Sequence, residues 1–161
     1  MARVYVGIGS NIEPHRHVRA ALADLRRAYG ELEVSPVYET EAVGFEGDDF
    51  LNLAVSFETD AEPGALVAGL REIEDRNGRR RGSARYVSRT LDLDLLLYDD
   101  LVAEDPGMNL PRKEILRFAF VLKPLADLAG DRRHPTDGRT FAELWATMAP
   151  EAPALRPVTL Q

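Results

Sequence analysis

Two aspartates in segment 89–98 have the residue type and spacing that metal chemistry requires. The segment reads RTLDLDLLLY, and alternating apolar and acidic residues that pass into an apolar run are typical of a β-strand leaving a core. Residues two apart on a strand point to the same face, so Asp92 and Asp94 are expected to lie together, about 7 Å apart along the backbone. Neighbouring carboxylates disfavour each other's ionisation, and a divalent cation removes that cost. We therefore interpret Asp92 and Asp94 as candidate metal ligands.

A cluster of arginines comes directly before this strand. Its members are Arg79, Arg80, Arg81, Arg85 and Arg89. Guanidinium groups match phosphate oxygens, and metals held by carboxylates beside arginines recur in enzymes of phosphoryl transfer. An Asp-x-Asp pair alone is a weak signal, and an arginine-rich loop alone is most often a solvated turn. Their direct succession on an apolar strand favours a functional site.

The composition limits the class of protein. The chain has 161 residues, of which 45% are hydrophobic, so we expect one domain over residues 1–161 with its own core. The absence of cysteine excludes disulfides and thiolate metal sites. The 27 acidic residues outnumber the 20 basic ones, which argues against general nucleic-acid binding. No apolar run reaches the length of a membrane span and the start does not resemble a signal peptide, so we expect a cytoplasmic protein without a membrane partner.

Hydrophobic periodicity predicts the order strand, helix, strand, strand, helix, strand. The expected elements cover residues 4–8, 14–29, 32–38, 50–59, 63–77 and 90–98. This order predicts an α+β fold with a ferredoxin-like βαββαβ core, in which two helices cover one face of a mainly antiparallel sheet. Helical stretches at 112–129, interrupted by Pro124, and at 140–147 are expected to cover the other face, giving a three-layer α/β/α sandwich. The proline-containing tail after about residue 150 is expected to be extended and loosely held.

Three further features have both a plain and a functional interpretation. Gly7 and Gly9 lack the third glycine and the Lys-Ser/Thr of phosphate loops, so we interpret them as turn residues. Phe50 and Asn52 share a strand face and suit a planar heterocycle, although a polar face with an edge aromatic is the stronger interpretation of this pair alone. Glu74 lies at the edge of an apolar helix stripe, where it either faces the site or is an ordinary solvated glutamate.

Several motifs together resemble the 6-hydroxymethyl-7,8-dihydropterin pyrophosphokinase family. The resemblance extends from Val4 to about Trp145, and its most specific part is the sequence RTLDLDLL at residues 89–96. The other matching segments are Ile8-Gly9-Ser10-Asn11, Tyr38-Glu39-Thr40, Phe50-Leu51-Asn52 and Phe120-Val121-Leu122-Lys123-Pro124-Leu125. Members of this family move pyrophosphate from ATP to the pterin hydroxymethyl group and release AMP, a step of folate biosynthesis.

The resemblance implies a role for each matching residue. Asp92 and Asp94 are implied to hold two Mg²⁺ ions on the ATP phosphates and, with Arg79 and Arg89, to be the catalytic residues; Asp94 is our candidate if a base is needed. Residues implied to bind pterin are Thr40, Val43, Phe50, Asn52, Tyr86 and Phe120, with Phe50 and Phe120 sandwiching the ring. Residues implied to bind ATP are Glu74, Arg79, Arg81, Arg85, Arg89, Arg112 and Arg117. The family is typically monomeric.

Four positions depart from the family pattern. Arg112 follows Pro111 where a histidine is common, and Phe118 stands where an arginine is usual, with Arg117 shifted by one. Val87 and Glu41 replace a loop glycine and a loop proline. Because none of these changes touches the metal carboxylates, we expect the KM for ATP to be the unusual kinetic parameter.

Two other classes of protein compete with this interpretation. A metal-dependent nucleotidyltransferase would use the aspartates and need nucleotide without pterin, which leaves Phe50, Asn52 and Phe120 without a role. A non-catalytic pterin or nucleotide sensor is favoured by the departures at Arg112 and Arg117. The intact aspartates and Arg89 favour the enzyme.

Overall fold

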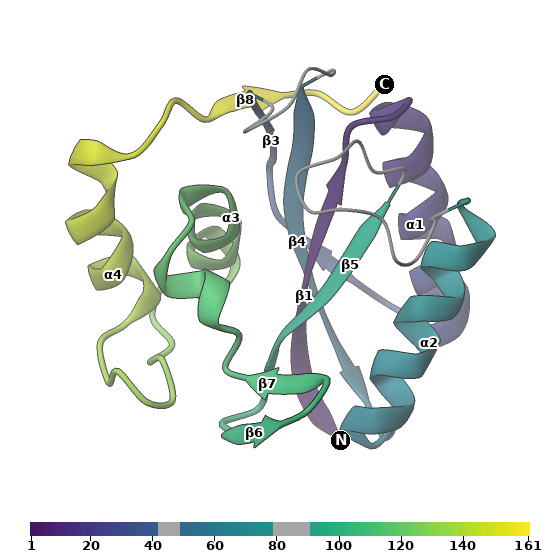
Figure 1. The fold of residues 1–161 in the computed structure, drawn as a ribbon, viewed down its shortest axis with the longest axis horizontal. Coiled ribbons are helices and arrows are strands. Elements are labelled where there is room, and N and C mark those ends of the chain that lie inside the picture. The colour runs from purple at the N-terminus through teal and green to yellow at the C-terminus, as the bar shows by residue number, and fades with distance from the viewer. Residues whose placement is uncertain (42–48, 79–90) are drawn as a thin grey trace.

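A central β-sheet with helices on both faces organises the chain. The computed structural model describes residues 1–41, 49–78 and 91–161. Its α-helices are α1 (Pro14–Tyr29), α2 (Pro63–Arg76), α3 (Ala119–Ala129) and α4 (Phe141–Met148). Helices α1 and α2 lie on one face of the sheet, while α3 lies on the other with α4 packed outside it (Figure 1). The expected α+β sandwich of three layers is confirmed.

The strands pair antiparallel throughout the described part of the chain. The main path contains β1 (Ala2–Ser10), β3 (Val37–Thr40), β4 (Phe50–Thr59), β5 (Asp92–Tyr98) and β8 (Arg156–Val158). Their order is β5-β1-β4-β3-β8, and the short β2 (Glu33–Val34) also pairs with β4. The strand that follows α2 therefore lies beside β1 at one edge, as in the ferredoxin-like arrangement.

Helices α1 and α2 begin and end where the sequence predicts. Each has proline in its first turn, where the missing N–H costs nothing, and Gly30 after α1 has a φ of 87°, a conformation that glycine adopts readily. The buried face of α1 and the buried stripe of α2 pack on the sheet in one apolar cluster. None of the helices within residues 1–41, 49–78 and 91–161 combines the length and apolarity that crossing a membrane requires.

Helices α3 and α4 form a separate apolar cluster on the face of the sheet opposite α1 and α2. Leu122 and Leu125 of α3 pack with Phe141 of α4 against Tyr5 and Leu97 of the sheet. Helix α4 begins with a capping box, in which the Thr140 hydroxyl accepts from the Glu143 N–H while the Glu143 carboxylate accepts from the Thr140 N–H. Between β5 and this layer lie the hairpin β6 (Ala103–Asp105) and β7 (Met108–Leu110) and the 3₁₀ turn η1 (Lys113–Leu116).

The break in the expected 112–129 helix lies earlier than we predicted. It falls at Phe118, which is extended and precedes α3, while Pro124 is accommodated inside α3. Pro124 is buried among apolar neighbours, and this packing outweighs the one helical hydrogen bond that a proline removes. A second 3₁₀ turn, η2 (Ala149–Glu151), ends the layer.

Two further expectations are corrected by the sheet. Gly7 and Gly9 are not turn residues, because both lie inside β1 and pair with strands on either side. The tail that we expected to be loosely held contains β8, which adds to the free edge of β3 through three residue pairs. The tail could not be placed from its own sequence, since its partner lies more than a hundred residues away.

Candidate active site

A row of residues across the sheet brings the two halves of the expected site together. Asp92 on β5 pairs with Gly9 on β1, and Gly9 pairs with Asn52 on β4. Directly opposite residues point to the same face, so Asp92 and Asn52 face the same side with only Gly9 between them. Adjacent strands lie about 4.8 Å apart, which separates the two backbones by about 10 Å. A small ligand spanning this gap would touch both side chains.

The missing side chain at Gly9 keeps that gap open. A Cβ atom at Gly9 would lie 3.2 Å from Oδ1 of Asn52, closer than an ordinary contact. Gly7, two residues earlier, pairs with Asp94 in the same way. The close approach to the Asn52 amide therefore explains the glycine at position 9, whereas a Cβ at Gly7 would make only an ordinary contact with Leu96. Gly7 and Gly9 are two residues apart, as are Asp92 and Asp94. This equal spacing is the sequence signal from which the pairing of the two strands could have been predicted.

Asp94 lies in a strongly negative environment. The pKa of its carboxyl is raised to about 6, mainly by burial; the Arg112 guanidinium lowers it, and the carboxylates of Asp92, Glu74 and Glu114 also raise it. With 45% of its side-chain surface exposed, Asp94 is crowded by protein yet open to solvent. A cation that arrives from solvent would relieve this repulsion.

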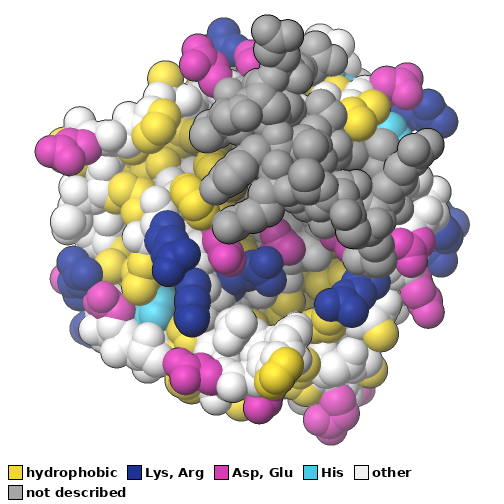
Figure 2. Space-filling view, in the orientation of Figure 1, with side chains coloured by type: hydrophobic (Ala, Val, Ile, Leu, Met, Phe, Trp, Pro, Cys, Tyr) yellow, Lys and Arg dark blue, Asp and Glu magenta, His cyan; other side chains and the backbone are white. Residues whose placement is uncertain are grey.

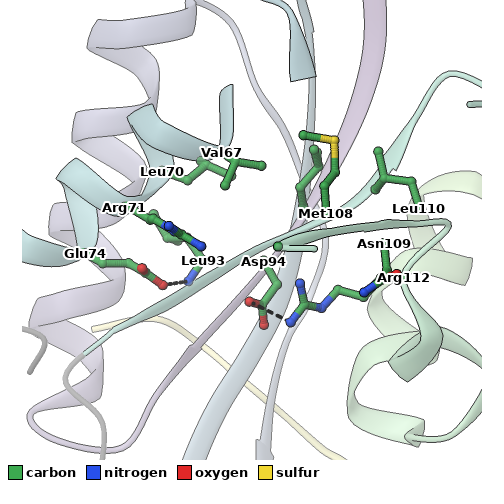
Figure 3. Close-up of a pocket in the computed structure, with 12 residues that line it drawn as sticks. Val67, Leu70, Arg71, Glu74, Leu93, Asp94, Met108, Asn109, Leu110 and Arg112 are labelled. Atoms are coloured by element: carbon green, nitrogen blue, oxygen red, sulfur yellow. Dashed lines mark hydrogen bonds and ion pairs between the residues drawn. The ribbon is translucent and has the colours of Figure 1, made fainter. Parts of the chain in front are cut away.

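Arg112 places a positive charge beside Asp94. Its Nη2 lies 3.4 Å from Oδ1 of Asp94, as Figure 3 shows, and its backbone N–H donates to the Leu96 carbonyl of β5. Its Nε lies 2.6 Å from Oε2 of Glu114, but the N–H does not point along this contact, so it is an ion pair and not a hydrogen bond. Arg112 thus lies between two carboxylates, and its ion pair with Asp94 contradicts the expectation that no departure from the family pattern touches the candidate metal ligands. Glu114 carries no sequence signal that would have marked it.

Glu74 holds the edge strand that carries the aspartates. Its side chain is 5% exposed, and its Oε2 accepts a buried hydrogen bond of 2.8 Å from the backbone N–H of Leu93, the residue between Asp92 and Asp94 (Figure 3). Among the strands that the structure describes, β5 is the last of the sheet, so this N–H has no strand partner there on its outer side. Glu74 is therefore not an ordinary solvated glutamate, because it is buried against the strand that carries the aspartates.

We expect Glu74→Ala to cost about 1–3 kcal/mol of unfolding free energy, because it leaves the buried Leu93 N–H without its acceptor. Glu74→Gln keeps an acceptor oxygen and should cost less. Urea denaturation measures both, with Glu72→Ala on the exposed face of the same helix as the control. Equal, small losses at positions 72 and 74 would contradict this role.

A cavity of about 170 Å³ opens beside these groups. Its walls come from α2, β5 and the β6–β7 hairpin, and Figure 3 shows Asp94 and Arg112 at one side with apolar side chains opposite. The apolar part consists of Val67, Leu70, Leu93, Leu95, Met108 and Leu110. On the face shown in Figure 2, acidic and basic side chains gather near the centre beside hydrophobic ones. The cavity suits a ligand with a flat apolar part and a charged part.

The residues implied to bind pterin lie on the neighbouring strands. Phe50 pairs with Thr40 across β4 and β3, and Asn52 donates from Nδ2 to the Thr40 hydroxyl at 2.9 Å. Phe120 lies in the first turn of α3. Its ring stacks on that of Phe118, with the ring centroids 5.2 Å apart and an angle of 17° between the ring planes. The side chain at the departing position 118 therefore supports one of the two rings expected to sandwich the ligand.

The donor set fits a magnesium ion shared with phosphate. Asp92 and Asp94 are two oxygen donors on one face, and Asp94 lies where negative charge accumulates. Within the ranges that the structure describes, there is no group of three or more His, Asp or Glu side chains arranged around a metal position. Magnesium is usually held by one or two carboxylates with the remaining sites filled by water and substrate phosphates. These two aspartates match that mode of binding.

Some expected residues are not brought to the site or cannot be placed. Arg117 is exposed at the end of η1, and its backbone N–H donates to the Glu114 carbonyl. Glu41 is exposed immediately after β3. The residues that lie outside the described ranges are Val43, Arg79, Arg80, Arg81, Arg85, Tyr86, Val87 and Arg89.

Sequence comparison agrees with these motifs. A model of the family described as 7,8-dihydro-6-hydroxymethylpterin-pyrophosphokinase matches residues 5–130. The 2-amino-4-hydroxy-6-hydroxymethyldihydropteridine pyrophosphokinase of Pseudomonas aeruginosa is 40% identical over 148 residues, which cover 89% of this chain and 90% of that protein. The Bacillus subtilis protein of the same name is 37% identical over 128 residues, covering 77% and 76%.

Structure comparison agrees with the fold. A Plasmodium falciparum HPPK-DHPS crystal structure with SDX-DHP aligns with a TM-score of 0.72 at 13% identity, over 94% of this chain. Another HPPK-DHPS structure, in complex with substrates, aligns with a TM-score of 0.71 at 12% identity. The chain spans less than half the length of these two proteins, 45% and 43%. At such low identity, this likeness concerns the fold alone.

Proposed function

The chain belongs to the 7,8-dihydro-6-hydroxymethylpterin-pyrophosphokinase family, and we propose that its Asp92–Gly9–Asn52 row is where pyrophosphate passes from ATP to the pterin. The activity is that of the family, a pyrophosphokinase of folate synthesis. The observation that supports the placement is the row itself, in which the carboxylate of Asp92 and the amide of Asn52 share one face. The proposal assigns a role to each part of this face.

ATP is proposed to lie with its base in the cavity beside α2 and its phosphates toward Asp94. The apolar walls formed by Leu70, Met108 and Leu110 suit a planar base, and Arg112 lies where a guanidinium can contact phosphate oxygens. Asp92 and Asp94 would hold two magnesium ions, which when bound neutralise charge on the phosphates. The arginines of segment 79–89 are proposed as further phosphate ligands.

The pterin is proposed to stack between Phe50 and Phe120. Asn52 would form a hydrogen bond with the edge of the pterin ring. Because Asn52 Nδ2 donates to the Thr40 hydroxyl, Oδ1 is the amide atom left to face the ring. Val43 and Tyr86 are proposed to complete the pocket. This placement leaves the hydroxymethyl group over Gly9, between the amide and the aspartates, where a side chain would obstruct it.

The residues contribute mainly by positioning. The hydroxymethyl oxygen attacks the β-phosphorus of ATP in line, the bond from that phosphorus to the α-phosphate oxygen breaks, and AMP leaves. Asn52 and the two rings would hold the alcohol, and the aspartates would hold the phosphates by way of bound magnesium, so that the reaction becomes effectively unimolecular. Asp94, which lies beside Asp92 on the phosphate side of the row, is the proposed acceptor if the alcohol proton passes to the protein.

The test is AMP release from ATP and magnesium, with and without 6-hydroxymethyl-7,8-dihydropterin. We expect AMP only when pterin is present, with one diphosphorylated pterin formed per AMP. AMP or pyrophosphate released without pterin would favour a nucleotidyltransferase. Pterin binding without AMP would favour a sensor. We also propose a monomer, because the row and the cavity come from one chain, and sedimentation tests this oligomeric state. A cytoplasmic location is part of the same proposal.

Arg112→Ala is expected to raise the KM for ATP about tenfold, because a charge-assisted contact to phosphate is lost. The KM for pterin should change less than twofold. Lys113→Ala removes the same charge from the adjacent exposed residue and is the control. An unchanged KM for ATP in Arg112→Ala would show that Arg112 has no part in phosphate binding.

A further inference from the structure

The C-terminal strand β8 is a part of the fold that the family match does not include. The match ends at residue 130, whereas β8 covers Arg156–Val158 and pairs with β3 (Figure 1). In Figure 1 the tail runs from α4, crosses beside β3 and ends near α1, so that it connects the two helical layers. Val158 and Leu160 pack against the main apolar cluster, and the Gln161 N–H donates to Nδ1 of His15. The strand is therefore held at its end as well as by pairing.

Arg156 of this strand joins the ends of β3 and β4. Its Nη2 contacts the carboxylate of Glu39 on β3, and the same Nη2 lies 3.2 Å from Oδ2 of Asp49, the residue before β4. In the strand register Arg156 pairs with Glu39. One guanidinium thus bridges two carboxylates, one on β3 and one just before β4.

These two carboxylates lie next to residues proposed to bind pterin. Thr40 follows Glu39, and Phe50 follows Asp49. Thr40 and Phe50 pair with each other across β3 and β4, and Thr40 accepts the hydrogen bond from Asn52. A displacement of Glu39 relative to Asp49 would therefore change the spacing of Thr40, Phe50 and Asn52 together.

We propose that β8 positions the pterin-binding wall, with Arg156 as its positioning residue, an inference that rests on the proposed function. Because both carboxylates contact one Nη2 atom, they lie close enough to repel each other once the guanidinium is removed. Exposed ion pairs contribute little to stability, so the main consequence of losing Arg156 is a wider separation of the two strand ends. Arg156 does not touch the ligand and acts through Glu39 and Asp49.

The test compares Arg156→Gln with Arg27→Gln, which removes the same charge from an exposed ion pair with Asp24 on α1. Titration of 6-hydroxymethyl-7,8-dihydropterin should give a Kd about three- to tenfold higher for Arg156→Gln, and unchanged for Arg27→Gln. The Kd for ATP should stay within twofold in both. Arg156→Lys keeps the charge and should bind pterin more tightly than Arg156→Gln. Adding Asp49→Asn to Arg156→Gln removes the repulsion and should recover part of the affinity.

Hydrogen exchange of the amides at residues 37–40 and 50–52 gives a readout without ligand, and we expect faster exchange in Arg156→Gln only. Wild-type pterin affinity and wild-type exchange in Arg156→Gln would overturn this inference and leave the proposed function intact. Equal losses of pterin and ATP affinity with a lower Tm would also overturn it, since β8 would then be a general structural element. A wild-type chain that binds no pterin would overturn the proposed function and this use of β8 with it.

Discussion

Asp92→Asn is expected to lower pterin-dependent AMP release by about a thousandfold, which corresponds to about 4 kcal/mol of transition-state stabilisation. The substitution keeps the size of the side chain and removes the negative charge that we propose holds a cation near the phosphates. The paired residue is Gly9, which has no side chain to replace the lost ligand. Asp100→Asn, in the exposed turn after β5, is the matched control and should keep full activity.

Metal binding separates this role of Asp92 from a general loss of activity. Mn²⁺ binding followed by paramagnetic relaxation in the presence of ATP should weaken in Asp92→Asn, while pterin affinity and Tm stay close to wild type. Full turnover of Asp92→Asn at saturating magnesium would exclude Asp92 as a metal ligand. Loss of turnover with unchanged Mn²⁺ binding would give Asp92 another role at the same place.

Gly9→Val is expected to reduce pterin-dependent turnover about a hundredfold or more. Its branched side chain would fill the gap between Asp92 and Asn52, and already its Cβ would lie 3.2 Å from the Asn52 amide oxygen. A misplacement of reacting groups by about 1 Å is enough for an effect of this size. Gly9→Ala places only the Cβ there and should show a smaller loss, of about tenfold.

The control for Gly9 is Gly64→Ala in α2, where a Cβ would meet nothing within 4 Å. We expect Gly64→Ala to keep wild-type turnover and Kd for pterin. Steady-state kinetics and the thermal midpoint are measured for each variant, because a loss of turnover counts only when the fold is kept. Wild-type turnover in Gly9→Val would show that the substrate does not cross β1 at this position.

Elements set by local pattern were predicted from the sequence. Helices α1 and α2 combine an apolar period with proline at the start and with asparagine or glycine after the end, and these signals fixed their bounds. The shared face of Asp92 and Asp94 follows from strand geometry alone. The fold followed from the order of the predicted elements, and the family resemblance, with the activity that it implies, rested on short motifs that are each contiguous in the chain.

Contacts between distant segments were not predictable in the same way. The clearance at Gly9 depends on the register of β1 with two other strands. The ion pair between Arg112 and Asp94 depends on how the β6–β7 hairpin folds back beside β5. The role of β8 depends on pairing with β3 over a separation of 117 residues between Arg156 and Glu39. No single stretch of sequence contains these relations.

The hydrogen bond between Glu74 and Leu93 also bears on how the protein avoids self-association. An edge strand such as β5 offers unpaired N–H and C=O groups onto which a strand of another molecule can add. The Leu93 N–H donates a hydrogen bond to the Glu74 carboxylate, and the Leu96 carbonyl accepts one from the backbone N–H of Arg112. The two groups that hold β5 in place therefore also leave it a poor template for intermolecular β-sheet, the first step of aggregation.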